Sequence, residues 1–138
     1  MVTDIHSLIL RNDRAELARM MAWIDDMVAP LELSPETTYA MQLCLEEAVV
    51  NIISYAFSAE TQHNVRIDVW RDCNRVIAEI TDDGEPFDPL AQELPGQPTD
   101  LQSAQIGGLG IKLMRSFAAD IAYQRAGETN RLTLAFAG

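Results

Sequence analysis

The sequence contains few cysteine, histidine and basic residues, and each shortage excludes a class of protein. Its two cysteines, Cys44 and Cys73, lie far apart, so they indicate neither a CxxC motif nor a disulfide framework. The two histidines are isolated as well, which argues against a structural zinc site. Ten Lys and Arg residues against 21 Asp and Glu residues give a formal net charge of −11. Nucleic-acid binding needs clustered basic side chains, so we expect none, and any anionic ligand must be held by local groups.

Long apolar runs, low-complexity tracts and internal repeats are also missing from the 138 residues. No stretch approaches the length that spans a membrane, and the N-terminus lacks the basic and apolar regions of a signal peptide. The composition, 48% hydrophobic and 22% charged, is that of a globular protein. We therefore expect a single soluble, cytoplasmic domain over residues 1–138.

Hydrophobic periodicity divides the chain into helices and strands. A capping box at Asp13 and Glu16 begins a predicted helix over 14–28, and Ser34 with Pro35 begins a second that runs to about residue 57. A third helix is predicted over 109–118. Alternating apolar residues predict strands over 65–71 and 75–81, and a less regular strand over 3–10. Two final strands, 120–125 and 130–136, turn around Gly127.

The order of these elements predicts an α+β fold. Strand pairs on short turns imply a two-layer α/β sandwich, with a mostly antiparallel sheet and the helices on one of its faces. Between the strand pair over 65–81 and the third helix, residues 83–107 contain four prolines and three glycines. A loop of this length inside a compact domain is often functional.

The second helix carries Glu47 and Asn51 one turn apart, on a face different from its apolar stripe. One interpretation is an ordinary helix surface that happens to carry an acid and an amide. The other is a carboxylate that acts as a base beside an amide oxygen that binds a hard cation such as Mg²⁺. The pair alone leaves both open.

Two further stretches allow both a structural and a functional interpretation. "ITDDGEPFDP" (80–89) ends a strand on Asp82, Asp83 and Gly84. It is either a plain turn or an aspartate that accepts a hydrogen bond from a ligand, beside a glycine that lets the ligand approach the backbone. "IGGLGIKLM" (106–114) is either a loop hinge or a glycine-rich loop whose helix N-terminus favours phosphate. It lacks the ending of a Walker A motif.

Taken together and in order, "EEAVVNIISYAF" (46–57), "DDGEPFDP" (82–89) and "GGLGIKLMRSF" (107–117) resemble the N-box and the two glycine boxes of the GHKL ATP-binding superfamily. Within it, the chain resembles the stand-alone anti-sigma-factor serine kinases of bacterial partner-switching pathways, over nearly its whole length. The resemblance implies the Bergerat ATP-binding fold, with ATP and Mg²⁺ as cofactors.

The resemblance also implies roles for residues of the N-box and the first glycine box. Glu47 matches the glutamate that activates the attacking hydroxyl of a serine or a water, and Asn51 matches the asparagine that coordinates Mg²⁺. Asp82 matches the aspartate that accepts from the adenine amino group, and Gly84 lets the base pack closely. Thr133, in the last strand, is expected near the adenine.

In the second glycine box, Gly108 and Gly110 match the glycines that wrap the phosphates, with Gly107 and Leu109 beside them. Residues 90–106 correspond to the mobile ATP lid, which here has no basic residue. Phosphate charge is therefore expected to be met by Mg²⁺, by the loop amides and by Lys112 or Arg115; a solvated helix residue is the alternative for Lys112.

The sequence also departs from the family's pattern at Tyr55 and Ala56, where many members of the family carry a histidine and a glycine.

The function that follows from the resemblance is an ATP-dependent protein-serine kinase that phosphorylates an antagonist protein and also binds a regulator such as a sigma factor. Two rivals stay open: a nucleotide-binding module that sequesters its partner without kinase activity, and a detached catalytic domain of a histidine kinase. The last ranks lowest because no phosphoacceptor helix precedes the boxes in this sequence. Members of the group commonly dimerise, so a homodimer is left open too.

Overall fold

A computed structural model of the chain describes residues 4–55, 63–88, 90 and 109–137. Within them a five-stranded sheet has the order β1-β2-β3-β5-β4, and every neighbouring pair is antiparallel. The strands are β1 (His6–Arg11), β2 (Asn64–Asp72), β3 (Arg75–Asp82), β4 (Asp120–Ala126) and β5 (Thr129–Ala137). The helices are α1 (Leu17–Met27), α2 (Pro35–Tyr55) and α4 (Leu109–Phe117). The predicted α+β class is confirmed.

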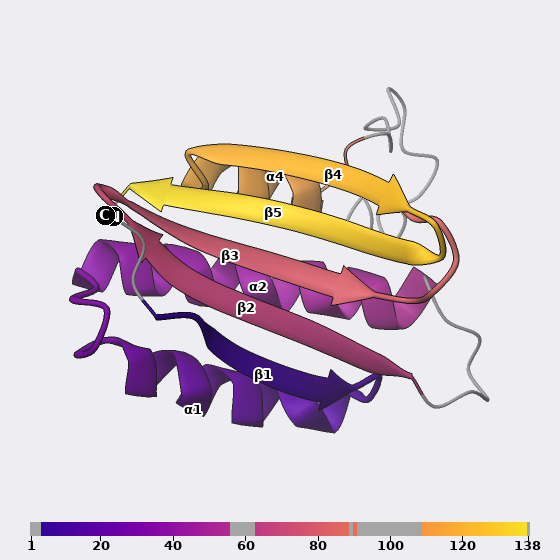
Figure 1. Ribbon diagram of the computed structural model, residues 1–138, viewed down its shortest axis with the longest axis horizontal. Coiled ribbons are helices and arrows are strands. Elements are labelled where there is room, and N and C mark those ends of the chain that lie inside the picture. Colours follow the sequence, from indigo (N-terminus) through magenta and orange to yellow (C-terminus); the bar gives the residue numbers. More distant parts are fainter. Residues whose placement is uncertain (1–3, 56–62, 89, 91–108, 138) are drawn as a thin grey trace.

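The helices cover one face of the sheet, so the molecule has two layers (Figure 1). The core between them is built from inward-facing residues of the strands, such as Ile67, Ile80 and Leu134, and from the inner sides of α1, α2 and α4, such as Ile24, Leu45 and Met114. Alternation along β2 and β3 places every second residue in this core. Among the described helices, none is long and apolar enough to cross a membrane.

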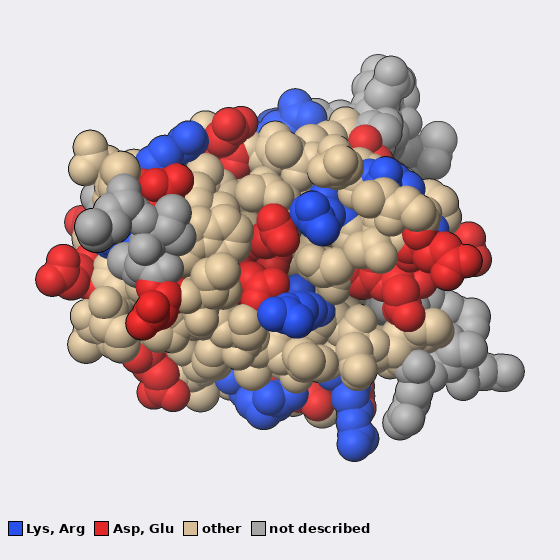
Figure 2. Space-filling model, in the orientation of Figure 1, with Lys and Arg blue, Asp and Glu red and all other residues tan. Residues whose placement is uncertain are grey.

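The other face of the sheet carries charged side chains. Figure 2 shows acidic and basic groups side by side in the middle of this face. Arg66 lies 3.1 Å from the carboxylate of Asp68, and Arg131 lies 3.7 Å from that of Glu79. Because these residues alternate with the buried ones, the sheet presents one apolar and one largely polar surface.

Two tight turns join the paired strands. Cys73 begins the turn between β2 and β3 with a φ of 56°, and Gly127 begins the turn between β4 and β5 with a φ of 61°. Glycine adopts this left-handed conformation without steric cost, whereas cysteine does so at some expense. Cys73 is exposed and Cys44, on α2, is fully buried. The predicted turn around Gly127 is confirmed.

The two predicted helix starts differ in outcome. The Ser34 hydroxyl accepts from the backbone N–H of Thr37 at 3.1 Å, so the predicted cap of α2 is confirmed. Asp13 instead caps a short 3₁₀ turn, Arg14–Glu16, by accepting from the N–H of Ala15. Glu16 pairs with Arg19 at 2.7 Å and does not complete the capping box, so α1 begins later than predicted. The predicted end of the second helix at residue 57 lies outside the described residues.

We expect Ile67→Ala to lower the free energy of unfolding by about 2–5 kcal/mol, because Ile67 is fully buried and its loss leaves a cavity. Ile9→Ala, in the adjacent strand, is the matched control. Ile9 is 52% exposed, so its truncation should cost about 1 kcal/mol or less. Urea denaturation followed by circular dichroism measures both, and equal losses would contradict the assignment of the core face.

Candidate functional site

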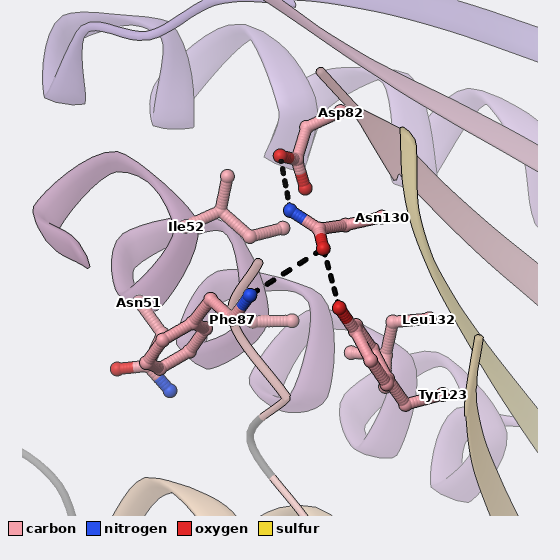
Figure 3. A pocket seen from close by; sticks show the side chains of 8 residues that line it. Asn51, Ile52, Asp82, Phe87, Tyr123, Asn130 and Leu132 are labelled. Atoms are coloured by element: carbon pink, nitrogen blue, oxygen red, sulfur yellow. Dashed lines mark hydrogen bonds between the residues drawn. The ribbon is translucent and has the colours of Figure 1, made fainter. Parts of the chain in front are cut away.

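A pocket lies between α2 and the ends of three strands. It is lined by Ala48, Asn51, Ile52, Asp82, Phe87, Tyr123, Asn130 and Leu132. Figure 3 shows these side chains converging from α2, β3, β4, β5 and the segment after β3. The cavity measures only about 10 Å³, which is room for about one water molecule. A larger ligand therefore has to displace a lining side chain.

Polar side chains are buried in this pocket. Among the described residues, four polar or charged ones are buried, and three of them, Asn51, Asp82 and Asn130, line it. Buried polar groups cost free energy unless they are hydrogen-bonded. Their gathering beside apolar Ile52 and Leu132 is typical of a ligand site rather than of a core.

One carboxylate oxygen of Asp82 is held by two donors. Its Oδ1 accepts from the backbone N–H of Gly84 at 2.9 Å and from the side-chain amide of Asn130 at 3.0 Å. Within the described part of the chain, no hydrogen bond to Oδ2 is present. The carboxylate is thus oriented by one oxygen and keeps the other as an acceptor for a ligand.

Asn130 joins this carboxylate to the segment that follows β3. Its amide nitrogen also donates to the carbonyl of Glu85 at 2.8 Å, and its Oδ1 accepts from the Tyr123 hydroxyl (Figure 3). Arg125 donates to the same Oδ1 at 3.2 Å and to the carbonyl of Gly84 at 2.8 Å. Both ends of the Asn130 amide are therefore satisfied, which fixes its orientation.

Burial raises the pKa of Asp82 above its ordinary value. The hydrogen bonds from Asn130 and Gly84 oppose this shift, Asp83 adds to it, and the charge of Arg125 opposes it. The balance shows that the protein stabilises the charged form only partly. A ligand that donates a hydrogen bond to the carboxylate would favour the charged form further.

Of the residues that line the pocket, Phe87 is held least firmly by the rest of the protein. It follows Pro86 in the segment after β3, and its backbone N–H lies 3.4 Å from Asn130 Oδ1, which is a long hydrogen bond. Its ring stacks on Tyr55 at the end of α2, with centroids 5.4 Å apart and an interplanar angle of 15°. The other lining residues belong to helices and strands. Phe87 is therefore the side chain that a ligand displaces at least cost.

Glu47 and Asn51 lie one turn apart on α2, as predicted. Asn51 is 5% exposed, and among the described residues its amide has no hydrogen-bond partner, so it is available to a ligand. Glu47 is half-buried. Desolvation, and then the charge of Glu46, raise its pKa. A carboxylate with a raised pKa takes up a proton more readily, as a general base must.

The other predicted site residues are only partly described. Gly107 and Gly108 lie outside the described residues, whereas Leu109 begins α4 and Gly110 follows it. Lys112 is an exposed residue of α4. The structure does not bring Thr133 into the pocket, because alternation along β5 puts it on the face opposite to Asn130 and Leu132.

Sequence reasoning missed Asn130, Tyr123, Phe87 and Arg125. For Asn130 a signal was present. In the alternation along β5 it shares the inward-facing side with Leu132, Leu134 and Phe136. A polar residue at a core position indicates a partner or a ligand. Tyr123 and Arg125 share a face of β4, but their convergence on one amide required the strand order.

A family model described as the histidine kinase-like ATPase domain matches residues 10–136. The chain is also 31% identical over 112 residues to the serine/threonine-protein kinase BtrW of Bordetella bronchiseptica. That alignment covers 81% of this chain and 79% of BtrW.

Two solved structures share the fold. The RsbU and RsbW domains of a Mycobacterium tuberculosis protein superpose with a TM-score of 0.67 at 11% identity, over 98% of this chain. The chain spans only 32% of that structure's length. The histidine kinase AdeS of Acinetobacter baumannii gives a TM-score of 0.52 at 15% identity, over 98% of this chain and 68% of AdeS.

We expect Asn130→Ala to lower the free energy of unfolding by about 2–3 kcal/mol, because it leaves the buried partners of the amide unsatisfied. Asn64→Ala, at the exposed start of β2, is the matched control and should change stability by about 0.5 kcal/mol or less. Urea unfolding compares the two variants. A loss for Asn130→Ala no greater than that of the control would show that the network does not hold the pocket.

Proposed function

The chain belongs to the histidine kinase-like ATPase domain family, and on this basis we propose that it is an ATP-dependent protein-serine kinase of the anti-sigma-factor type. Its likeness to BtrW, a protein named a serine/threonine-protein kinase, supports phosphoryl transfer to a protein. The substrate is an antagonist protein of a partner-switching pathway, and the kinase also binds a regulator such as a sigma factor. These last assignments rest on the family resemblance.

The observation that carries the proposal is the buried, oriented carboxylate of Asp82. Adenine presents an exocyclic amino group, and Asp82 Oδ2 would accept from it while Oδ1 is held by Gly84 and Asn130. Ile52 and Leu132 offer apolar contacts to the faces of the base. The base takes the space that Phe87 occupies, and Gly84, which has no side chain, allows it to lie close to the backbone.

Phosphoryl transfer requires a base for the attacking hydroxyl, and Glu47 has the chemistry for it. The serine oxygen forms a bond to the γ-phosphorus, the bond from that phosphorus to the β–γ bridging oxygen breaks, and ADP leaves. The proton of the serine passes to Glu47, whose raised pKa favours its uptake. Such reactions depend mainly on positioning and charge neutralisation.

Asn51 is the residue that fits a magnesium ion. Mg²⁺ prefers oxygen ligands and commonly takes most of them from water and from substrate phosphates, with few from protein. Among the described residues, no group of three or more His, Cys, Asp or Glu side chains is placed to hold a metal. The proposed magnesium site is shared between Asn51 and the triphosphate. The ion would neutralise phosphate charge. The glycine box over 107–110 and Lys112 are proposed to hold the phosphates.

Glu47→Gln should reduce phosphoryl transfer by about 100-fold or more, because it removes the base but keeps the shape of the side chain. Its affinity for ATP should stay close to that of the wild type. Radiolabelled ATP with Mg²⁺ and a candidate antagonist protein measures transfer, and calorimetry measures binding. Asp26→Asn, at an exposed position of α1, is the control.

Two results would contradict this assignment. Undiminished transfer by Glu47→Gln would remove Glu47 as the base. A wild-type chain that binds ATP and the antagonist without transfer would be a sequestration module instead.

Asp82→Ala should weaken ATP binding by about 10- to 100-fold, because a hydrogen bond to a charged group is lost. Asp83→Ala is the matched control. Asp83 is exposed, and its carboxylate lies 3.1 Å from the His63 ring rather than against a group of the pocket. Calorimetric titration with ATP compares the two variants, and equal effects would overturn the adenine assignment.

A further inference from the structure

A second hollow lies at the opposite end of α2 from the pocket. It is a groove of about 310 Å³, between the first turns of α2, the end of α4 and the end of β5. Figure 1 shows that α2 begins, and α4 and β5 end, at the same side of the molecule, away from the ends of β3 and α2. Its volume falls within the range of ligand sites in proteins. The lining residues are Glu36, Thr37, Tyr39, Ala40, Ser116, Phe117, Phe136 and Ala137.

Two exposed aromatic rings form the rim of this groove. Tyr39 is 59% and Phe117 is 40% exposed. The rings meet edge to face, with centroids 5.7 Å apart and an interplanar angle of 74°. The ring faces that remain open are electron-rich and attract cations as well as apolar groups.

Most polar groups of the groove are already used inside the protein. The Thr37 hydroxyl donates to the carbonyl of Ala137 at 2.8 Å, and the Ser116 hydroxyl donates to the carbonyl of Lys112 at 2.9 Å. Glu36 differs, because among the described residues it has neither a hydrogen bond nor an ion-pair partner. The groups left to recognise a ligand are thus one carboxylate and the aromatic rings.

We propose that this groove is a docking site for a polypeptide segment that presents an Arg or Lys side chain between apolar residues. The cation would meet the Glu36 carboxylate and the face of Tyr39, while the apolar neighbours would cover the exposed ring of Phe117. Charge complementarity favours this occupant, since Glu36 is the one charged group among the lining residues and the chain carries a net charge of −11.

The proposal rests on the proposed function only in assigning the segment to the protein substrate. Glu36 and Glu47 both belong to α2, and the helical rise places them roughly 16 Å apart along its axis. An extended chain covers that span with about five residues or more. The substrate would therefore carry its basic anchor at least about five residues from the serine that is phosphorylated.

The test uses the full chain labelled with ¹⁵N and the peptide acetyl-Leu-Arg-Leu-amide, with acetyl-Leu-Glu-Leu-amide as its charge-reversed counterpart. The arginine peptide should cause saturable amide shifts at residues 36–40, 115–118 and 135–137. The glutamate peptide should cause none there. Shifts confined to other parts of the chain, or equal shifts with both peptides, would overturn the proposal.

Single substitutions test which residues of the groove bind the arginine peptide. Glu36→Gln and Tyr39→Ala should each weaken binding of the arginine peptide by about threefold or more, whereas Asp26→Asn, an exposed acid on α1, should not. Affinity unchanged by both groove variants would sink the proposal. ATP binding is measured on the same samples and should be unaffected by Glu36→Gln. A groove that binds the peptide in a chain that fails to bind ATP would contradict the proposed function alone.

Discussion

Asp82 and Asn130 stand opposite each other in the antiparallel ladder between β3 and β5, and the pocket depends on this register. Both side chains point to the face that the helices cover, where Ile80 and Leu132 form the next opposed pair. A slip of either strand by one residue would turn its own side chain, the Asp82 carboxylate or the Asn130 amide, to the charged outer face and bury Thr81 or Arg131 instead. The core alternation that stabilises the sheet therefore also fixes the site.

The remaining polar groups are arranged around that pair. The Asn130 amide binds the backbone after β3, and Arg125 and Tyr123 hold the amide from the neighbouring strand. A buried carboxylate with a raised pKa is costly to the fold, and here the cost is offset by hydrogen bonds on one oxygen only. A site that retains an unused acceptor is less stable than a fully satisfied one and is better suited to receiving a ligand.

Much of the architecture could be predicted because it follows from local patterns. The alternation over 65–71 and 75–81 and the Ser34 cap need no knowledge of tertiary structure, and the structure contains β2, β3 and α2 where these patterns place them. The Asp13 cap was predicted with the wrong partner. The Glu16 carboxylate pairs with Arg19 rather than with the backbone at the helix start. The four-residue capping-box pattern does not include Arg19, so it cannot predict this competition.

Only the residues of the candidate site that belong to sequence motifs could be predicted. Glu47, Asn51 and Asp82 stand out in the sequence, but the pairing of Asn130 with Asp82 becomes visible only when β5 is placed beside β3. Thr133 lies on the outer face because side chains alternate along β5, and the alternation that points Asn130 inward points Thr133 outward. The closeness of Phe87 to Tyr55 depends on how the segment after β3 meets the end of α2, which no local pattern encodes.

The two cysteines differ in a way that is useful at the bench. Burial, and then the charge of Glu47, raise the pKa of Cys44 to about 12, so at neutral pH its thiol is protonated as well as enclosed. Cys73 is exposed in the turn between β2 and β3, at the same side of the molecule as the end of β5 (Figure 1). Thiol-directed reagents react with the accessible thiolate. The native chain can therefore carry a fluorophore or spin label at a single position, remote from the pocket, without any cysteine having to be removed.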